Sequence, residues 1–144
     1  RQQENSEKVI IYPIVGLLSL FVLFQCVNGI GYVKYDAGYN IALLLNQIND
    51  IEVIGYKMDD VPQKGLDFYS KNSYISVDNL DIIKNNGKPI YLVSKYEYLQ
   101  QIMNKYPKGL VYKNISGCEI GIYLENLFDL NKLKLTHFII IKLN

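Results

Sequence analysis

The feature that most constrains this chain is an uncharged run of 25 residues near its N-terminus. It extends from Val9 to Val33, "VIIYPIVGLLSLFVLFQCVNGIGYV", and Lys8 and Lys34 stand at its two ends. At a rise of about 1.5 Å per residue, a helix of this length measures about 37 Å, which exceeds the roughly 30 Å hydrocarbon core of a bilayer. The run therefore predicts a transmembrane helix over residues 9–33, preceded by a juxtamembrane segment over residues 1–8.

A core helix, a signal peptide and a lipid-modified segment each fit this run less well. A core helix of a globular domain would show a polar stripe, and the run has none. A cleaved signal peptide would have a shorter apolar core and a small-residue cleavage site, whereas this run ends in "LFQCVNG". A lipid-modified Cys26 would follow small residues rather than Phe24 and Gln25. Charges at the two ends do not decide which end faces the cytoplasm. The chain begins at Arg1 rather than at methionine, which suggests a piece of a longer protein.

The overall charge and the cysteines exclude several functional classes. Fifteen Lys and Arg against 14 Asp and Glu leave a net charge of +1, so the chain lacks the basic field that drives nonspecific binding of nucleic acid. We therefore expect no nucleic-acid partner. Cys26 and Cys118 lie far apart and outside any Cys/His cluster, so we expect neither a disulfide framework nor a metal site.

The remaining residues, 34–144, alternate between helical and strand-like patterns. Helices are predicted over 36–50, 78–87 and 95–109, with a short helical turn over 66–71 and a short helix over 127–132. Strands are predicted over 51–58, 74–77, 88–94, 109–115, 119–125 and 136–143. Residues 59–65 read as a loop because they hold two aspartates, Pro62 and Gly65. This order predicts one small α/β domain with a mixed sheet covered by helices, in which the last strands pair antiparallel.

Catalytic motifs are scarce in this domain. The lone histidine, His137, begins an apolar strand, which is more typical of a core or edge residue than of a catalyst. The neighbouring Asp59 and Asp60 could bind a metal or act as a base, but a solvated loop is the simpler interpretation. Asn114 begins a glycosylation sequon, a triplet that also arises by chance.

The stretch "KYEYLQQIMNKYPKGLVYK", residues 95–113, interleaves lysines with tyrosines. Beside a bilayer, Lys34, Lys95 and Lys105 could contact lipid headgroups. The alternative is a helix whose apolar side packs on the core and whose lysines extend into water.

The order of the parts resembles a known family. An uncharged span, a helix, a strand ending in a loop, "LDFYSKNSYISV" and "PIYLVS" resemble the C-terminal domain of polytopic lipid-linked-sugar glycosyltransferases. These are the aminoarabinose transferases that act on lipid A, which are related to protein O-mannosyltransferases. Phe68 and Tyr69 match an aromatic pair of that family, and 75–77 match the short strand that follows it. The resemblance covers nearly the whole chain, and its motif is short.

The resemblance implies transfer of a sugar from a polyprenyl-phosphate donor to a lipid or protein acceptor, with a divalent metal in some members. The acidic catalytic residue of the family lies in an early loop that this chain does not contain, so no catalytic residue, metal site or cofactor is assigned here. The chain would then be a non-catalytic part that shapes or covers the acceptor side, packed against upstream membrane helices. It would sit in the cell membrane, with residues after 34 outside the cytoplasm.

A second interpretation from another class remains open. The chain could be a membrane-anchored, extracytoplasmic binding or sensory module in a protein without catalysis. Within either interpretation, we expect Phe68 to be buried as a structural pin. We expect Tyr69 to be partly exposed, where its hydroxyl could bind an acceptor sugar or phosphate.

Overall fold

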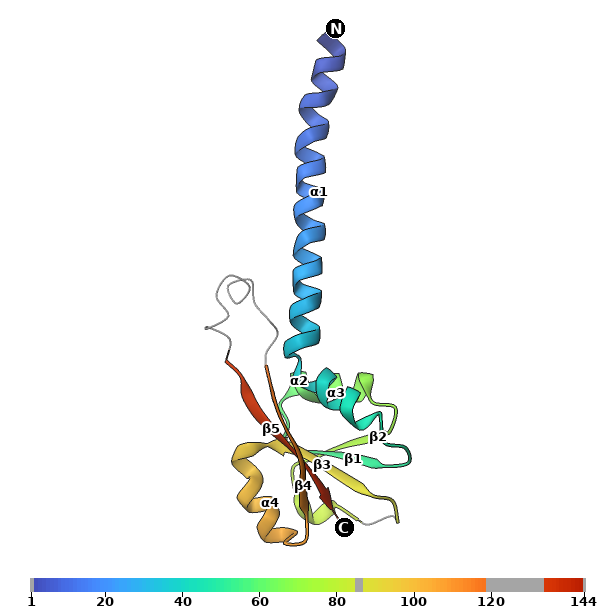
Figure 1. The fold of residues 1–144 in the computed structure, drawn as a ribbon, viewed down its shortest axis with the longest axis vertical. Helices are drawn as coiled ribbons and strands as arrows, with labels where there is room; N and C mark the ends of the chain where they lie inside the picture. Colours follow the sequence, from blue (N-terminus) through green and yellow to red (C-terminus); the bar gives the residue numbers. More distant parts are fainter. Residues whose placement is uncertain (1, 85–86, 119–133, 144) are drawn as a thin grey trace.

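The computed structural model describes residues 2–84, 87–118 and 134–143. A long N-terminal helix stands away from a small α/β domain (Figure 1). The helices are α1 (Gln2–Tyr35), α2 (Ala37–Leu45), α3 (Asp60–Tyr69) and α4 (Leu99–Lys105), with 3-10 turns η1 (Leu80–Ile82) and η2 (Tyr96–Tyr98). The strands are β1 (Glu52–Tyr56), β2 (Ser73–Val77), β3 (Ile90–Lys95), β4 (Leu110–Gly117) and β5 (Thr136–Leu143).

The five described strands form one mixed sheet in the order β2-β1-β3-β5-β4. β1 pairs in parallel with both β2 and β3, whereas β5 is antiparallel to β3 and β4. The predicted mixed α/β domain and the antiparallel pairing of the last strands are therefore confirmed. Parallel neighbours need a crossover, and here α3 joins β1 to β2 while the η1 segment joins β2 to β3.

Each face of the sheet carries its own apolar core. Alternate residues of a strand point to opposite faces, so Val53 and Val93 pack with α2 and α3, while Ile54 and Leu92 pack with α4 and η1. β5 contributes to both cores through Phe138 and Ile140 on one face and Ile139 and Ile141 on the other. The result is a helix–sheet–helix arrangement. A buried serine, Ser94, is satisfied because its hydroxyl donates to the carbonyl oxygen of Tyr56 at 2.9 Å.

Two glycines let α2 and α3 approach each other closely. A Cβ atom placed on Gly38 would lie 2.5 Å from the carbonyl oxygen of Pro62 and 2.9 Å from Cα of Gly65. Both neighbours are backbone atoms, which cannot move aside cheaply. The prediction of a loop over 59–65 is wrong, because residues 60–65 belong to α3. Pro62 is tolerated because it lies in the first turn of α3, and Gly65 is favoured by this helix contact.

Other sequence predictions differ from the structure in extent. The helix predicted over 78–87 is reduced to the 3-10 turn η1, and the helix predicted over 95–109 divides into η2 and α4. Asn79 caps this turn, because its side-chain oxygen accepts from the N–H of Asp81. The predicted strand over 119–125 and helix over 127–132 lie outside the described residues.

The N-terminal helix α1 is continuous over 34 residues. Its side chains are described for residues 12–26 and for Tyr35. In the part of the chain that the structure describes, no helix combines the length and the apolar character needed to cross a membrane. The membrane span over 9–33, and with it the division into 1–8, 9–33 and 34–144, stays a prediction.

Candidate functional site

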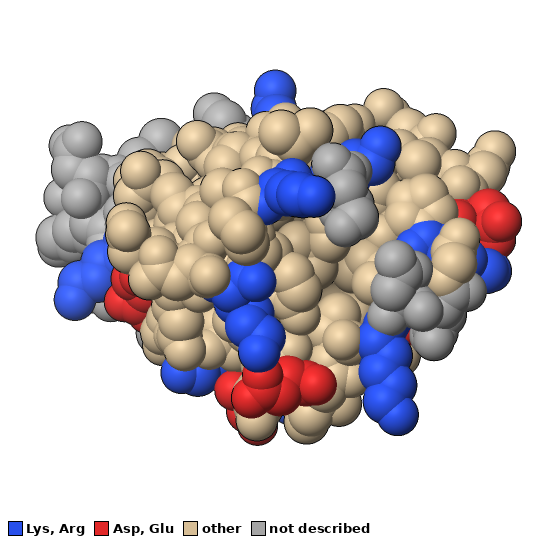
Figure 2. Space-filling model, turned by 90° about the horizontal axis from the view of Figure 1, so that it is seen from below, with Lys and Arg blue, Asp and Glu red and all other residues tan. Residues whose placement is uncertain are grey.

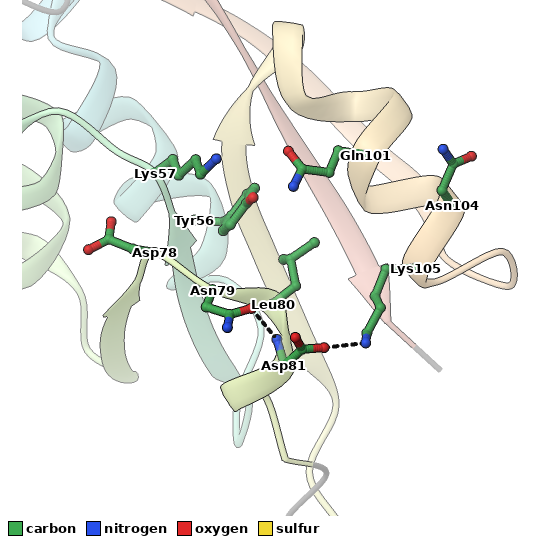
Figure 3. Close-up of a pocket in the computed structure, with 9 residues that line it drawn as sticks. All are labelled: Tyr56, Lys57, Asp78, Asn79, Leu80, Asp81, Gln101, Asn104 and Lys105. Carbon is green, nitrogen blue, oxygen red and sulfur yellow. Dashed lines mark hydrogen bonds and ion pairs between the residues drawn. The ribbon is translucent and has the colours of Figure 1, made fainter.

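Within the part of the chain that the structure describes, a pocket with several convergent polar side chains lies where two parallel strands end. Lys57 directly follows β1 and Asp78 directly follows β2. In open α/β sheets, ligands bind outside the carboxyl ends of the strands, because the connecting segments diverge there. In this domain the α4 side of that edge carries a pocket of about 430 Å³ (Figure 3). Its lining comprises Tyr56, Lys57, Asp78, Asn79, Leu80, Asp81, Gln101, Asn104 and Lys105.

Lys57 occupies an unusual backbone conformation at this edge. Its φ angle is 48°, a left-handed value that is unfavourable for a residue with a Cβ atom. Its N–H donates to the carbonyl oxygen of Val77 at 3.1 Å, which ties the end of β1 to the end of β2. The Nζ atom lies 5.4 Å from the ring centroid of Tyr56 and 5.0 Å from that of Tyr98, within cation–π range.

An ion pair closes the other end of the pocket. Lys105, the last residue of α4, pairs with Asp81 of η1. The hydrogen bond from Lys105 lowers the pKa of the Asp81 carboxyl and raises the pKa of the Lys105 amine. Nearby, the hydroxyl of Tyr106 donates to the carbonyl oxygen of Leu80 at 2.9 Å, and burial raises the pKa of that hydroxyl. These contacts hold η1 and α4 together as the two walls.

The lining offers many hydrogen-bonding groups. It holds amines, carboxylates, carboxamides and a phenol as donors and acceptors. Tyr56 forms the floor and is 1% exposed. Figure 3 shows Lys57 and Gln101 pointing toward each other above Tyr56, while the side chains of Asp78 and Asn104 point away from that space.

In the aromatic pair of α3, Tyr69 is partly exposed as expected, but the expected burial of Phe68 is contradicted. Phe68, expected to be buried, is 80% exposed, so that prediction is wrong. Tyr69 is half-buried against the core, and its ring lies 5.1 Å from that of Tyr39 and 4.9 Å from that of Phe68. The reason is helical phase, because Tyr69 shares the inner face of α3 with Leu66 whereas Phe68 is rotated outward. The lining of the pocket does not include Tyr69.

Of the predicted headgroup lysines, the two whose side chains are described, Lys95 and Lys105, are not brought together. Lys95 lies at the end of β3, where its amine pairs with Asp59 at 2.7 Å. Lys105 lies at the end of α4 in the pocket. The side chain of Lys34 is outside the described part of the chain. Figure 2 shows the domain from below, with lysines spread over that face and acidic side chains close to several of them.

The other candidate residues from the sequence analysis, His137, Asp59 and Asp60, are all exposed. His137 is exposed on β5, opposite Ser116 of β4, with 2.8 Å between its Nδ1 atom and the serine hydroxyl. No described carboxylate is hydrogen-bonded to that histidine, so the pair has no orienting acid among the described residues. Asp60 begins α3 as an exposed residue, and Asp59 precedes it. No group of three or more potential metal ligands occurs within residues 2–84, 87–118 and 134–143.

Sequence reasoning missed the pocket residues Lys57, Asn79, Gln101 and Asn104. A usable signal existed, because Asp78 directly follows the predicted strand over 74–77 and Lys57 is the next-to-last residue of the predicted strand over 51–58. These positions alone do not give the order of the strands in the sheet. Comparison with protein-family models, with curated proteins and with solved structures finds no match to this chain.

Proposed function

We propose that this chain is the last membrane helix and the extracytoplasmic α/β domain of a glycosyltransferase that uses a polyprenyl-phosphate-linked sugar. The domain is non-catalytic and shapes or covers the acceptor side of a groove built by upstream membrane helices. The acceptor is a lipid or a protein, and any divalent metal belongs to the parent chain.

One observation carries this proposal: α1 is joined directly to an edge of the sheet. The carbonyl oxygen of Tyr35, the last residue of α1, accepts from the N–H of Cys118 at 2.7 Å. Asp36 forms a β-bridge with Cys118, which follows β4. The end of β4 pairs with the start of β5, and the start of β5 pairs with the end of β3. α1 therefore joins the domain at the end of the sheet where β3 ends.

This attachment supports a position of the sheet edge beside the membrane. Only Lys34 and Tyr35 lie between the predicted span and the bridge at Asp36, a helical rise of about 3 Å. The large apolar side chains from Tyr12 to Phe24 are 39% to 71% exposed, which favours an apolar partner around α1. An acceptor held at that edge would lie at the level of the lipid headgroups.

A second candidate is a membrane-anchored binding or sensory module without catalysis. The observation that favours it is the pocket between η1 and α4, whose lining holds donors and acceptors but no nucleophilic serine or cysteine. Many apolar spans upstream of Arg1, with an acidic residue in the first external loop, would favour the transferase. A single span would favour the module.

Topology is tested by cysteine labelling in cells that produce the protein. In a background with Cys26→Ala and Cys118→Ala, a cysteine introduced at the exposed Ser73 should react with a membrane-impermeant thiol reagent in intact cells. A variant that retains only Cys26, inside the predicted span, serves as the unlabelled control. Reaction at Ser73→Cys only after lysis would place the domain in the cytoplasm and contradict the proposal.

Activity is tested separately on the purified chain. It should transfer no sugar from a polyprenyl-phosphate donor, because the catalytic loop and the donor groove belong to the upstream helices. Measurable transfer by this chain alone would contradict the non-catalytic role.

A further inference from the structure

Three polar groups in the pocket have hydrogen-bonding capacity that the described residues do not use. The amine of Lys57, the hydroxyl of Tyr56 and the carboxamide of Gln101 make no hydrogen bond or ion pair with another described residue, although the amine contacts two tyrosine rings. They come from the end of β1 and from α4, and Figure 3 shows Lys57 and Gln101 converging above the Tyr56 ring. Such convergent groups in a concave site are typical of a place where a small polar molecule binds.

The charges of the lining favour a neutral molecule. The lining holds two lysines, Lys57 and Lys105, and two aspartates, Asp78 and Asp81. Asp81 is paired with Lys105, and the side chain of Asp78 points away from the space between Lys57 and Gln101 (Figure 3). A phosphate dianion would meet one unpaired amine while lying near the carboxylate of Asp81, which disfavours it. A neutral molecule avoids that repulsion and can donate to Asp81 while it accepts from Lys57 and Gln101.

The size and the walls of the pocket narrow the class of ligand further. A volume of about 430 Å³ is at the small end of ligand pockets, which hold roughly 300–1,000 Å³. Tyr56 at the floor is 1% exposed and Leu80 is 6% exposed, so the groups that a ligand reaches are mainly the polar side chains of the lining. Such a lining suits a small molecule that carries several hydroxyl groups.

We propose that the pocket between η1 and α4 binds a neutral sugar of one or two residues, held by Lys57, Tyr56 and Gln101. The inference goes beyond the proposed function, which requires only the attachment of the domain to α1. It holds whether the parent chain is a glycosyltransferase or a binding module, so either proposal can fail without the other.

The test is a titration of the full, ¹⁵N-labelled chain in micelles of a zwitterionic detergent that carries no sugar headgroup. The probes are glucose, mannose, N-acetylglucosamine and maltose, with inorganic phosphate as the competing chemistry. At least one neutral sugar should bind with a Kd of about 1–10 mM and shift the amide signals of Lys57, residues 78–81 and residues 101–105.

The matched pair of variants is Gln101→Ala and Gln100→Ala. Both change an exposed glutamine of α4, but only Gln101 lines the pocket. Gln101→Ala should weaken sugar binding about three- to tenfold, as expected for a lost hydrogen bond, and Gln100→Ala should leave it unchanged. The proposal is overturned if no neutral sugar shifts these signals up to about 100 mM. It is also overturned if phosphate binds there more tightly, or if the two variants behave alike.

Discussion

At the residue scale, Lys57 shows backbone strain next to the candidate pocket. A left-handed φ costs a residue with a Cβ atom roughly 1–2 kcal/mol, and such conformations persist where surrounding contacts impose them. Here the imposed contact is the hydrogen bond from Lys57 N–H to Val77, which joins β1 to β2. The same conformation positions the amine over Tyr56 and Tyr98.

Because of this strain, glycine and alanine at position 57 should differ in stability in the order opposite to the usual one. Lys57→Gly and Lys57→Ala both remove the amine and its ring contacts, but only glycine adopts a positive φ without strain. Lys57→Gly should therefore be more stable than Lys57→Ala by about 1 kcal/mol, although alanine is normally the more stabilising of the two. Urea unfolding of the two variants in the same detergent measures the difference. A more stable alanine variant would show that the left-handed conformation is not retained in solution.

Tyr74 is a second residue whose environment has a measurable consequence. Its hydroxyl is buried and makes no hydrogen bond of normal geometry with a described residue. Burial raises its pKa from 10.0 to about 12, and the nearby side chain of Ser76 opposes part of this shift. Between these two values the unfolded chain releases the phenolic proton while the folded chain keeps it. The unfolded state is then favoured, so the contribution of Tyr74 to stability is complete below pH 10 and is lost as the pH rises to about 12.

We expect the free energy of unfolding to decrease less steeply above pH 10 in Tyr74→Phe than in the parent chain. Phenylalanine cannot ionise. The loss of a buried hydroxyl without a well-formed hydrogen bond should change the free energy of unfolding little at neutral pH. Urea unfolding at pH 8, 10 and 11 measures the difference. Parallel pH curves for the two proteins would mean that the Tyr74 hydroxyl is solvated in the folded state.

At the element scale, the orientation of α3 decides which of its apolar residues stabilise the domain. Pro62, Gly65 and Leu66 form its buried face, with Tyr69 half-buried on the same side. This face packs on α2 and on the sheet. Phe68 lies on the opposite side, in contact with the ring of Tyr69.

Truncations on the two sides of α3 should therefore differ. Leu66→Ala should destabilise the domain by about 2–5 kcal/mol because it empties a fully buried site. Phe68→Ala should cost at most about 1 kcal/mol, since it removes an exposed ring and one edge contact. Thermal unfolding monitored by near-UV circular dichroism compares the two. Equal losses would imply that Phe68 packs against something in solution, such as an upstream helix.

At the scale of the whole molecule, the helix and the domain are connected through few described contacts. Neither apolar core contains a described residue of α1, and the first residue to join a core is Ala37. The described link is backbone hydrogen bonding between the end of α1 and the residues around Cys118. The free energy of unfolding should therefore come from the contacts within the α/β domain and not from α1.

A chain truncated to begin at Lys34 should unfold cooperatively at the same urea concentration as the full chain, within about 10–15%. It retains the Tyr35 carbonyl that accepts from Cys118. A shorter chain that begins at Asn46 loses Ile41 and Leu45 from the core and should not fold. Loss of the cooperative transition in the longer truncation would show that α1 contributes to the fold.

Local patterns in the sequence were enough for the class of the domain and most of its strands. The runs at 51–58, 88–94 and 136–143 are rich in β-branched and aromatic residues, and a strand needs only such a run and a boundary. The same patterns failed over 59–65, where aspartates, a proline and a glycine indicate a loop. That segment is helical because Gly65 meets Gly38 of another helix, a contact that no local pattern contains.

The sequence by itself determined that the chain has a long uncharged segment, a mixed α/β domain and no familiar catalytic motif. Only the tertiary structure decided that Tyr69 packs inward while Phe68 is exposed, because adjacent residues of a helix are rotated by about 100° and the start of α3 sets their phase. It also decided the pocket, whose walls come from the ends of β1 and β2, from η1 and from α4. These segments meet because β1 pairs with both β2 and β3, and strand order depends on long-range pairing that no short stretch of sequence encodes.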